Sequence, residues 1–212
     1  MAGLIDSRGI VHQQDYQDLN ALSELGTKAY RDTGNVHIDQ RYAPVRAPWS
    51  LVTSTFAYYS GTGIPYFENS SYTYEDGYID RLGLGFVGFG RVTKKDYLLH
   101  IQTTTQNLHT LRGAPSQEET RHFPSMTLLQ SKVYDYRETY GSNKEWNLLL
   151  SRSVDKDYLK GISSHSDYQY DELGYPTHMK LAYGKCNKIV ERKLRHRIGF
   201  SYHLGILEEQ TE

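Results

Sequence analysis

The clearest pattern in the sequence is a strict alternation of side-chain type between Lys193 and Leu204. Apart from His196, one face of this stretch is apolar, whereas the other face carries Arg195 and Arg197. A period of two residues places alternate side chains on opposite faces of a β-strand, and a helix cannot use it to bury one face. The stretch therefore predicts a long β-strand near the C-terminus.

Further runs of β-branched, aromatic or alternating residues predict more strands, separated by glycine, proline and asparagine turns. They cover residues 51–59, 96–105, 126–140, 145–154, 158–163 and 178–185. The last of these is expected to pair with Lys193–Leu204 as a hairpin. We expect a mainly β fold, in the form of an antiparallel sandwich or barrel of about seven to nine strands.

One helix is expected near the N-terminus, beginning after Asp15 as its N-cap. Apolar residues follow at spacings of three and four, which forms one stripe on a helix: Tyr16, Leu19, Leu22, Leu25 and Ala29. Gly34 is a suitable terminator.

The expected organisation is an N-terminal region, residues 1–50, followed by a β-rich domain, residues 51–212. The first region combines an extended arm, the helix and a proline-bearing connector at 35–50. Within the β-rich domain, residues 66–78 suggest an exposed loop or a polar hairpin. Residues 113–125 suggest a loop with one helical turn, and the terminal LEEQTE suggests an acidic tail.

Tyrosine is unusually common, with 19 copies against 6 Phe and 2 Trp. A tyrosine covers apolar surface and keeps its hydroxyl wet, so it suits strands and contact surfaces. The net charge is −1, which favours neither nucleic-acid binding nor an acidic tail protein. The single cysteine, Cys186, excludes a disulfide within the chain.

The glycines at 83, 85 and 88 match the spacing of a dinucleotide-binding loop. That site requires a helix immediately afterwards, and Phe89 to Thr93 are poor helix starters. We expect these glycines to let neighbouring groups approach a strand closely. No other catalytic motif is present, and the scattered histidines offer no metal-ligand spacing, so we expect no cofactor and no metal.

A basic cluster between Lys180 and Arg197 could pair with carboxylates of a partner, contact phosphates, or be only a solvated strand face. Candidate interface residues are Tyr16, Leu19, Leu22, Tyr42, Trp49, Arg195 and Arg197.

Taken together, these features favour a non-enzymatic structural subunit of a larger assembly, such as a viral or phage head, neck, tail or baseplate. A homo-oligomer or a complex with other subunits is expected. An alternative is a binding module for carbohydrate or another polar ligand that uses Tyr66, Tyr72, Tyr74 and Glu75. A further alternative is a β-barrel enzyme whose catalytic residues are dispersed along the chain.

The start of the sequence does not resemble a signal peptide, which favours a cytoplasmic or virion location. Alternating, tyrosine-rich strands also occur in transmembrane β-barrels. Charges on expected outward faces, such as Lys160 and His196, favour no membrane.

Overall fold

The computed structural model describes most of the chain, in ten segments. These are residues 2–5, 9–19, 28–34, 41–46, 49–59, 68–140, 146–171, 174–184, 188–198 and 203–211. The chain divides into two compact units, Met1–Leu128 and Leu129–Glu212. This division lies at a different place from the boundary at residue 50 that the sequence suggests, and that boundary stays a prediction.

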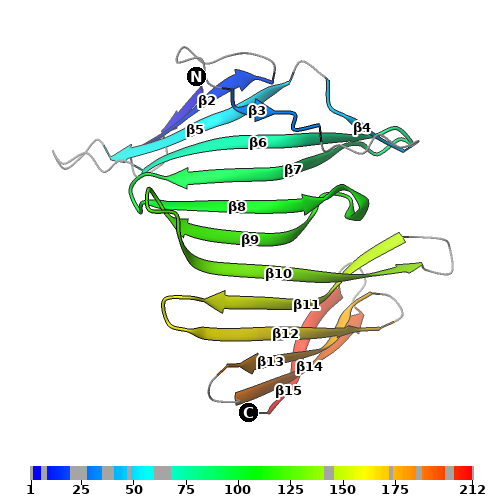
Figure 1. The fold of residues 1–212 in the computed structure, drawn as a ribbon. Helices are drawn as coiled ribbons and strands as arrows, with labels where there is room; N and C mark the ends of the chain where they lie inside the picture. Colours follow the sequence, from blue (N-terminus) through cyan, green and yellow to red (C-terminus); the bar gives the residue numbers. More distant parts are fainter. Residues whose placement is uncertain are drawn as a thin grey trace. The chain divides into compact units, whose positions relative to one another are not determined.

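The first unit is an antiparallel sheet in the order β1-β2-β5-β6-β7-β8-β9, whose strands from β5 onward are consecutive in the chain (Figure 1). Its strands are β1 (Ala2–Ile5), β2 (Ile10–Asp18), β3 (Tyr30–Arg31), β4 (Tyr42–Pro44), β5 (Ser50–Tyr59), β6 (Glu68–Asp80), β7 (Gly85–Asp96), β8 (Ile101–Leu108) and β9 (Ala114–His122). The short strands β3 and β4 pair with β6, β3 in parallel and β4 antiparallel.

The second unit is a β-meander in the order β10-β11-β12-β13-β14-β15. Its strands are β10 (Thr127–Tyr140), which begins just before the boundary, β11 (Trp146–Asp157), β12 (Ile162–Tyr170), β13 (Pro176–Tyr183), β14 (Lys188–Ile198) and β15 (His203–Thr211). All five pairings are antiparallel.

The mainly β prediction is confirmed, but the expected sandwich or barrel is wrong because the strands form an open sheet. Among the described residues, no pairing joins β1 to β9 or β10 to β15. The strands also outnumber the expected set, because polar stretches form strands as well: Glu68–Asp80 pairs with β5 and β7, and Ala114–His122 pairs with β8.

The expected N-terminal helix is also wrong where the structure describes it. Asp15 and Tyr16 lie within β2, and Tyr30 lies in β3, while residues 20–27 are outside the described part. The described part contains no α-helix and a single 3-10 turn, His109–Leu111. Strand pairing explains the difference, because β2 pairs with both β1 and β5 and alternates in burial along its length. This ladder outweighs the helical spacing of the apolar residues.

Other local predictions are confirmed in part. The strands at 51–59 and 126–140 are confirmed as β5 and β10, and the expected hairpin forms through the register His178↔Lys193. The loops at 66–78 and 113–125 are wrong where described, because β6 and β9 occupy most of them. The expected acidic tail lies in β15, which ends at Thr211.

The core of the first unit gathers side chains from its N-terminal segments and its central strands. Leu19, Tyr30, Val45 and Leu51 are buried and contact one another. Partly buried side chains of β6 and β7 pack against this cluster: Tyr74, Ile79 and Phe89. Among the side chains described in the second unit, only Ser131 is buried.

The close approaches expected at the glycines at 83, 85 and 88 are wrong: a Cβ atom at the first two would meet nothing within 4 Å, and at the third only Gly113 at 3.8 Å. Close approaches occur instead at Gly77 and Gly90. A Cβ atom at Gly77 would collide with the Val45 side chain. At Gly90 a Cβ atom would lie 3.2 Å from the Asp76 Cβ and 3.4 Å from the Tyr78 ring. No helix follows the glycines at 83, 85 and 88, because strand β7 begins at Gly85. This geometry removes the helix N-terminus that a dinucleotide site requires.

Candidate functional site

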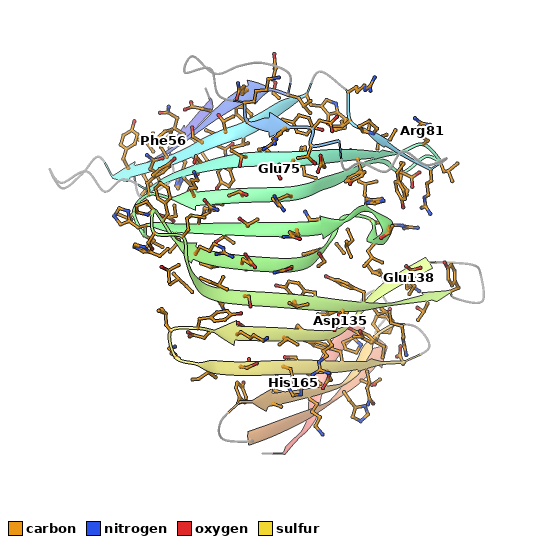
Figure 2. The ribbon with its side chains drawn as sticks, viewed as in Figure 1. Phe56, Glu75, Arg81, Asp135, Glu138 and His165 are labelled. Atoms are coloured by element: carbon orange, nitrogen blue, oxygen red, sulfur yellow. The ribbon has the colours of Figure 1, made fainter. Side chains whose placement is uncertain are left out.

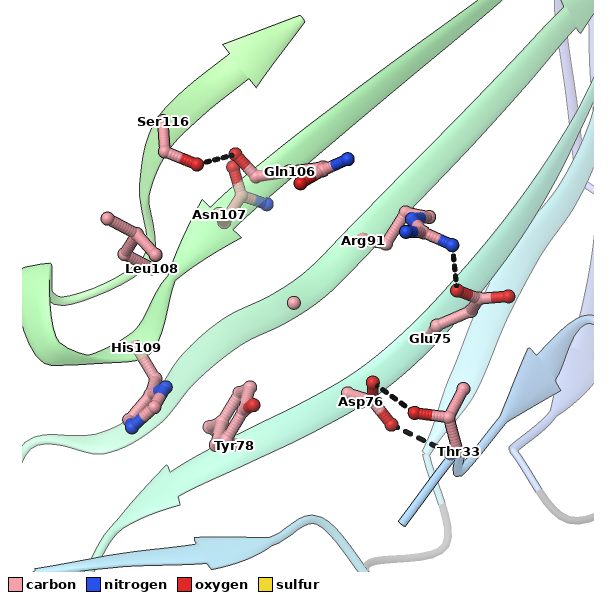
Figure 3. Close-up of a pocket in the computed structure, with 11 residues that line it drawn as sticks. Thr33, Glu75, Asp76, Tyr78, Arg91, Gln106, Asn107, Leu108, His109 and Ser116 are labelled. Atoms are coloured by element: carbon pink, nitrogen blue, oxygen red, sulfur yellow. Dashed lines mark hydrogen bonds and ion pairs between the residues drawn. The ribbon is translucent and has the colours of Figure 1, made fainter. Parts of the chain in front are cut away.

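A pocket of about 230 Å³ opens on the first unit, between strands β6, β7 and β8 and the 3-10 turn (Figure 3). Strand β6 contributes Glu75, Asp76 and Tyr78, and β7 contributes Arg91. Strand β8 and the turn contribute polar and ring side chains that include Gln106, Asn107 and His109. Its residues are mainly polar, with one aromatic wall.

The backbone of β6 brings two successive carboxylates to this one pocket. Neighbouring residues in a regular strand point to opposite faces, but Asp76 has a left-handed conformation with φ +52°. Both Glu75 and Asp76 therefore line the pocket. A non-glycine residue with positive φ inside a strand stores local strain, a feature that is common at binding sites.

Glu75 forms an ion pair with Arg91 of the adjacent strand, at 2.9 Å from Oε2 to Nη1 (Figure 3). The register Glu75↔Arg91 places the two residues directly opposite each other. The Arg91 side chain is about half exposed, at 47%, and that of Glu75 is 24% exposed. An ion pair with this much solvent exposure contributes little to stability. The same exposure lets a ligand reach both side chains.

Asp76 is anchored by Thr33 through two hydrogen bonds. The Thr33 backbone N–H donates to Oδ1 at 2.8 Å, and the Thr33 hydroxyl donates to Oδ2 at 2.7 Å. Asp76 is only 9% exposed. These bonds fix the carboxylate as a rigid part of the pocket wall.

The aromatic wall consists of Tyr78 and His109, whose rings stack at a centroid distance of 4.4 Å and an angle of 14°. Tyr42 meets the same His109 ring edge-on at 5.1 Å. Burial raises the pKa of the Tyr78 phenol, and nearby Asp76 acts in the same direction. The tyrosine is therefore neutral at physiological pH and presents an uncharged ring.

One polar side chain of β8 and one of β9 are held in place as well. The Asn107 amide donates to the Phe89 carbonyl at 2.8 Å, and the Ser116 hydroxyl donates to the Gln106 carbonyl at 3.2 Å. Among the described residues, no group of three His, Cys, Asp or Glu side chains could hold a metal ion. The arrangement offers fixed hydrogen-bond donors and acceptors beside a ring stack.

The predicted interface residues lie in different environments. Tyr16 is 46% exposed on β2, and Trp49 is 36% exposed with its ring edge-on to Phe86 at 4.8 Å. Leu19 and Tyr42 are buried within the first unit, at 3% and 4% exposed. Leu22 is outside the described residues.

Arg195 and Arg197 lie on β14, opposite Ile206 and Leu204 of β15. The structure describes the backbone of these two strands but not their side chains. Their expected role at an interface stays a prediction.

The residues expected for the alternative ligand site do not line one common pocket where the structure describes them. Glu75 lines the pocket, whereas the Tyr74 hydroxyl donates to the Val52 carbonyl at 2.9 Å and its ring packs on Phe89 in the core. Burial raises the pKa of Tyr74 to about 12. The Tyr72 hydroxyl lies 3.4 Å from the Thr55 hydroxyl, and Tyr66 is outside the described part.

Sequence reasoning missed Arg91, Gln106 and His109. They come together through the registers of β6, β7 and β8, and no short motif contains them. The left-handed conformation of Asp76 could have been suspected from the Glu75-Asp76-Gly77 sequence, which resembles a turn.

A second feature of the first unit is an apolar surface at the hairpin turns after β7 and β9, which we call the hairpin-tip patch. It consists of Tyr97, Leu98, Leu99, Phe123 and Met126. Leu99 is 62% exposed, and Tyr97, Leu98 and Met126 are between 40% and 43% exposed. The two turns are linked, because the Phe123 N–H donates to the His100 carbonyl at 2.7 Å and the Tyr97 and Phe123 rings meet edge-on at 6.1 Å.

The hairpin-tip patch is held rigidly. Asp96 Oδ1 accepts the backbone N–H groups of Leu98 and Leu99, at 3.0 and 2.9 Å. The Tyr97 N–H donates to the Asn69 carbonyl at 3.0 Å. Turn residues are usually polar, so a fixed cluster of exposed apolar side chains at this position requires an explanation.

The second unit carries a small charged cluster on β11 and β12, where His165 is labelled in Figure 2. Asp167 lies 3.7 Å from Arg152 Nε and 3.6 Å from His165 Nε2. All three side chains are more than a third exposed, which is typical of a solvated strand face.

Comparison with protein-family models and with curated proteins finds no match to this chain. No helix in the described part is long and apolar enough to cross a membrane.

Proposed function

We propose that the protein is a non-enzymatic structural subunit of a larger assembly, and that it associates with copies of itself through the hairpin-tip patch. The observation that carries this proposal is the rigid cluster of exposed apolar side chains at Tyr97–Leu99 and Met126, with the partly buried Phe123 ring beside them. Pre-organised apolar and aromatic groups lose little entropy on binding, and such groups dominate the energetics of interfaces.

Two further features support self-association. The net charge is −1, so electrostatic repulsion between copies is weak. Strands β8 and β9 lie between the two turns that carry the patch, and neither strand has a buried residue. A sheet region without a packed face is stabilised when other protein covers it. A viral or phage particle stays the predicted context.

The test is light scattering on the size-exclusion peak over a wide concentration range, for the full chain and for Leu99→Asp. We expect defined oligomers for the unchanged chain and at least about tenfold weaker association for Leu99→Asp, because a charge would be buried in the contact. Thr110→Asp is the matched control, since it adds the same charge at an exposed turn outside the patch. A clean monomer at every concentration, or equal weakening by both variants, would contradict the proposal.

A further inference from the structure

We propose that the pocket between β6, β7 and β8 binds a single neutral sugar ring. This site is separate from the hairpin-tip patch and does not depend on self-association. A polar pocket with an aromatic wall can satisfy both properties of a sugar, namely a rim of hydroxyl groups and an apolar face of C–H groups.

The size of the pocket sets the size of the ligand. Its volume of about 230 Å³ is below the usual range for drug-sized ligands, roughly 300–1,000 Å³. Gly90 keeps this space open, because a Cβ atom there would contact Asp76 and Tyr78 at the pocket floor. One sugar ring is the ligand that such a space accommodates.

The charges of the pocket favour a neutral ligand. Glu75 is neutralised by Arg91, and Asp76 is satisfied by two hydrogen bonds from Thr33. A phosphate would meet two carboxylates and one guanidinium, which opposes its binding. The remaining carboxylate lone pairs can accept hydroxyl hydrogen bonds, and the second guanidinium edge of Arg91 and the Gln106 amide can donate them.

The aromatic wall would set the orientation of the bound sugar. The Tyr78 and His109 rings are fixed by their mutual stacking and by Tyr42. Tyr78 is only 7% exposed, so the preformed apolar surface is mainly the partly exposed His109 ring with the edge of Tyr78. The sugar's C–H face would lie against this surface, with its hydroxyl groups directed toward Glu75 and Arg91. Figure 3 shows the Glu75–Arg91 pair and the ring pair on different sides of the same opening.

The direct experiment is saturation-transfer NMR of the full chain with methyl glycosides of glucose, galactose, mannose, xylose and N-acetylglucosamine, followed by amide shift mapping. We expect at least one glycoside to bind with a dissociation constant of about 1–10 mM, as is usual for a small polar ligand. Shift changes should centre on Glu75, Arg91 and His109. Choline serves as a cationic probe of the same ring wall, and no binding is expected.

Variants locate the site. Glu75→Gln and Gln106→Ala should each weaken glycoside binding by about tenfold, because the first replaces a charged acceptor paired with Arg91 by a neutral amide and the second removes an amide from the pocket. Thr110→Ala, at the exposed turn beside His109, should leave binding unchanged. Shift mapping on the unchanged chain also locates the binding site, and it does not depend on whether a variant folds. The proposal is overturned if no glycoside binds, if choline binds more tightly, or if the shifts map elsewhere.

Discussion

Two regions of the first unit use the same hydrogen-bonded sheet in different ways. Around β6, the strands contribute Tyr74 and Ile79 to a packed core with Leu19, Val45 and Leu51. In β8 and β9 no residue is fully buried, and almost every position is half-buried. Strand pairing alone therefore continues the sheet beyond its core, so local stability should fall from β6 to β9.

The side chains of β8 and β9 explain how an unpacked region remains a strand. Their cross-strand pairs are polar, with the Thr93 and Thr104 hydroxyls at 3.4 Å and the Thr103 and Thr120 hydroxyls at 3.5 Å. Threonine favours extended backbone, and opposed pairs of this kind stabilise a sheet by fractions of a kcal/mol each. These contributions are smaller than the burial of a single core leucine.

The largest effect is expected at Leu51, which is 8% exposed in the core cluster. Leu51→Ala should lower the free energy of unfolding of the first unit by about 2–5 kcal/mol, because it leaves a cavity among packed side chains. Urea unfolding followed by Trp49 fluorescence, in a Trp146→Phe background, reports on this unit. A loss below about 0.5 kcal/mol, the range usual for surface positions, would remove the distinction between the two regions.

Gly77 tests how tightly the core is packed. Gly77→Ala should destabilise the first unit by about 1–3 kcal/mol, since the new methyl group collides with Val45. Adding Val45→Ala should recover part of this loss by making room, although Val45→Ala alone is destabilising. Simple additivity of the two losses in urea unfolding would show that the two residues do not interact.

Asp80 links the packed region to pH. A hydrogen bond from Arg41, 2.8 Å long, lowers the pKa of the Asp80 carboxyl, and the Leu82 N–H acts in the same direction. A carboxyl whose folded pKa is lowered adds stability above its unfolded pKa of about 3.9, and this stability is lost as the pH falls through the folded pKa.

Asp80→Asn should therefore lower the urea midpoint at neutral pH, and its difference from the unchanged chain should shrink below about pH 4. Glu118→Gln, on half-buried β9, is the matched control and should show a smaller difference. If the difference in urea midpoint between Asp80→Asn and the unchanged chain stays constant with pH, the Arg41–Asp80 pair does not contribute to the pH dependence of stability.

The smallest effect is expected in β8. Thr104→Val keeps the branched side chain and removes only the hydroxyl that faces Thr93. The free energy of unfolding should change by less than about 0.5 kcal/mol, as for most half-exposed positions. A loss near that of Leu51→Ala would show that β8 carries a core of its own.

The sequence predicted the strands whose side chains alternate or are β-branched, such as Leu51–Tyr59, and it predicted the hairpin that joins β13 to β14. It failed where tertiary pairing overrode local spacing. Tyr16 and Leu19 fit a helical stripe, yet β2 is placed between β1 and β5 by a ladder of backbone hydrogen bonds. Polar strands such as β9 carry too little hydrophobic periodicity to be recognised.

Only part of the pocket was foreseeable. Glu75 was a candidate because it lies in a tyrosine-rich stretch, but its partner Arg91 lies 16 residues away and is brought opposite it by the register of β6 and β7. The convergence of His109 with Tyr78 depends on the 3-10 turn after β8. Register and turn geometry are set by the whole sheet, so a local pattern cannot specify them.

The most direct test of the structural-subunit proposal is hydrogen exchange of the full chain, measured by mass spectrometry at low and high protein concentration. We predict that residues 97–126, which contain the hairpin-tip patch and β8–β9, become more protected as concentration rises. Residues 68–80, in the packed region, should keep the same protection. Exchange in residues 97–126 that does not change with concentration would contradict self-association through this surface.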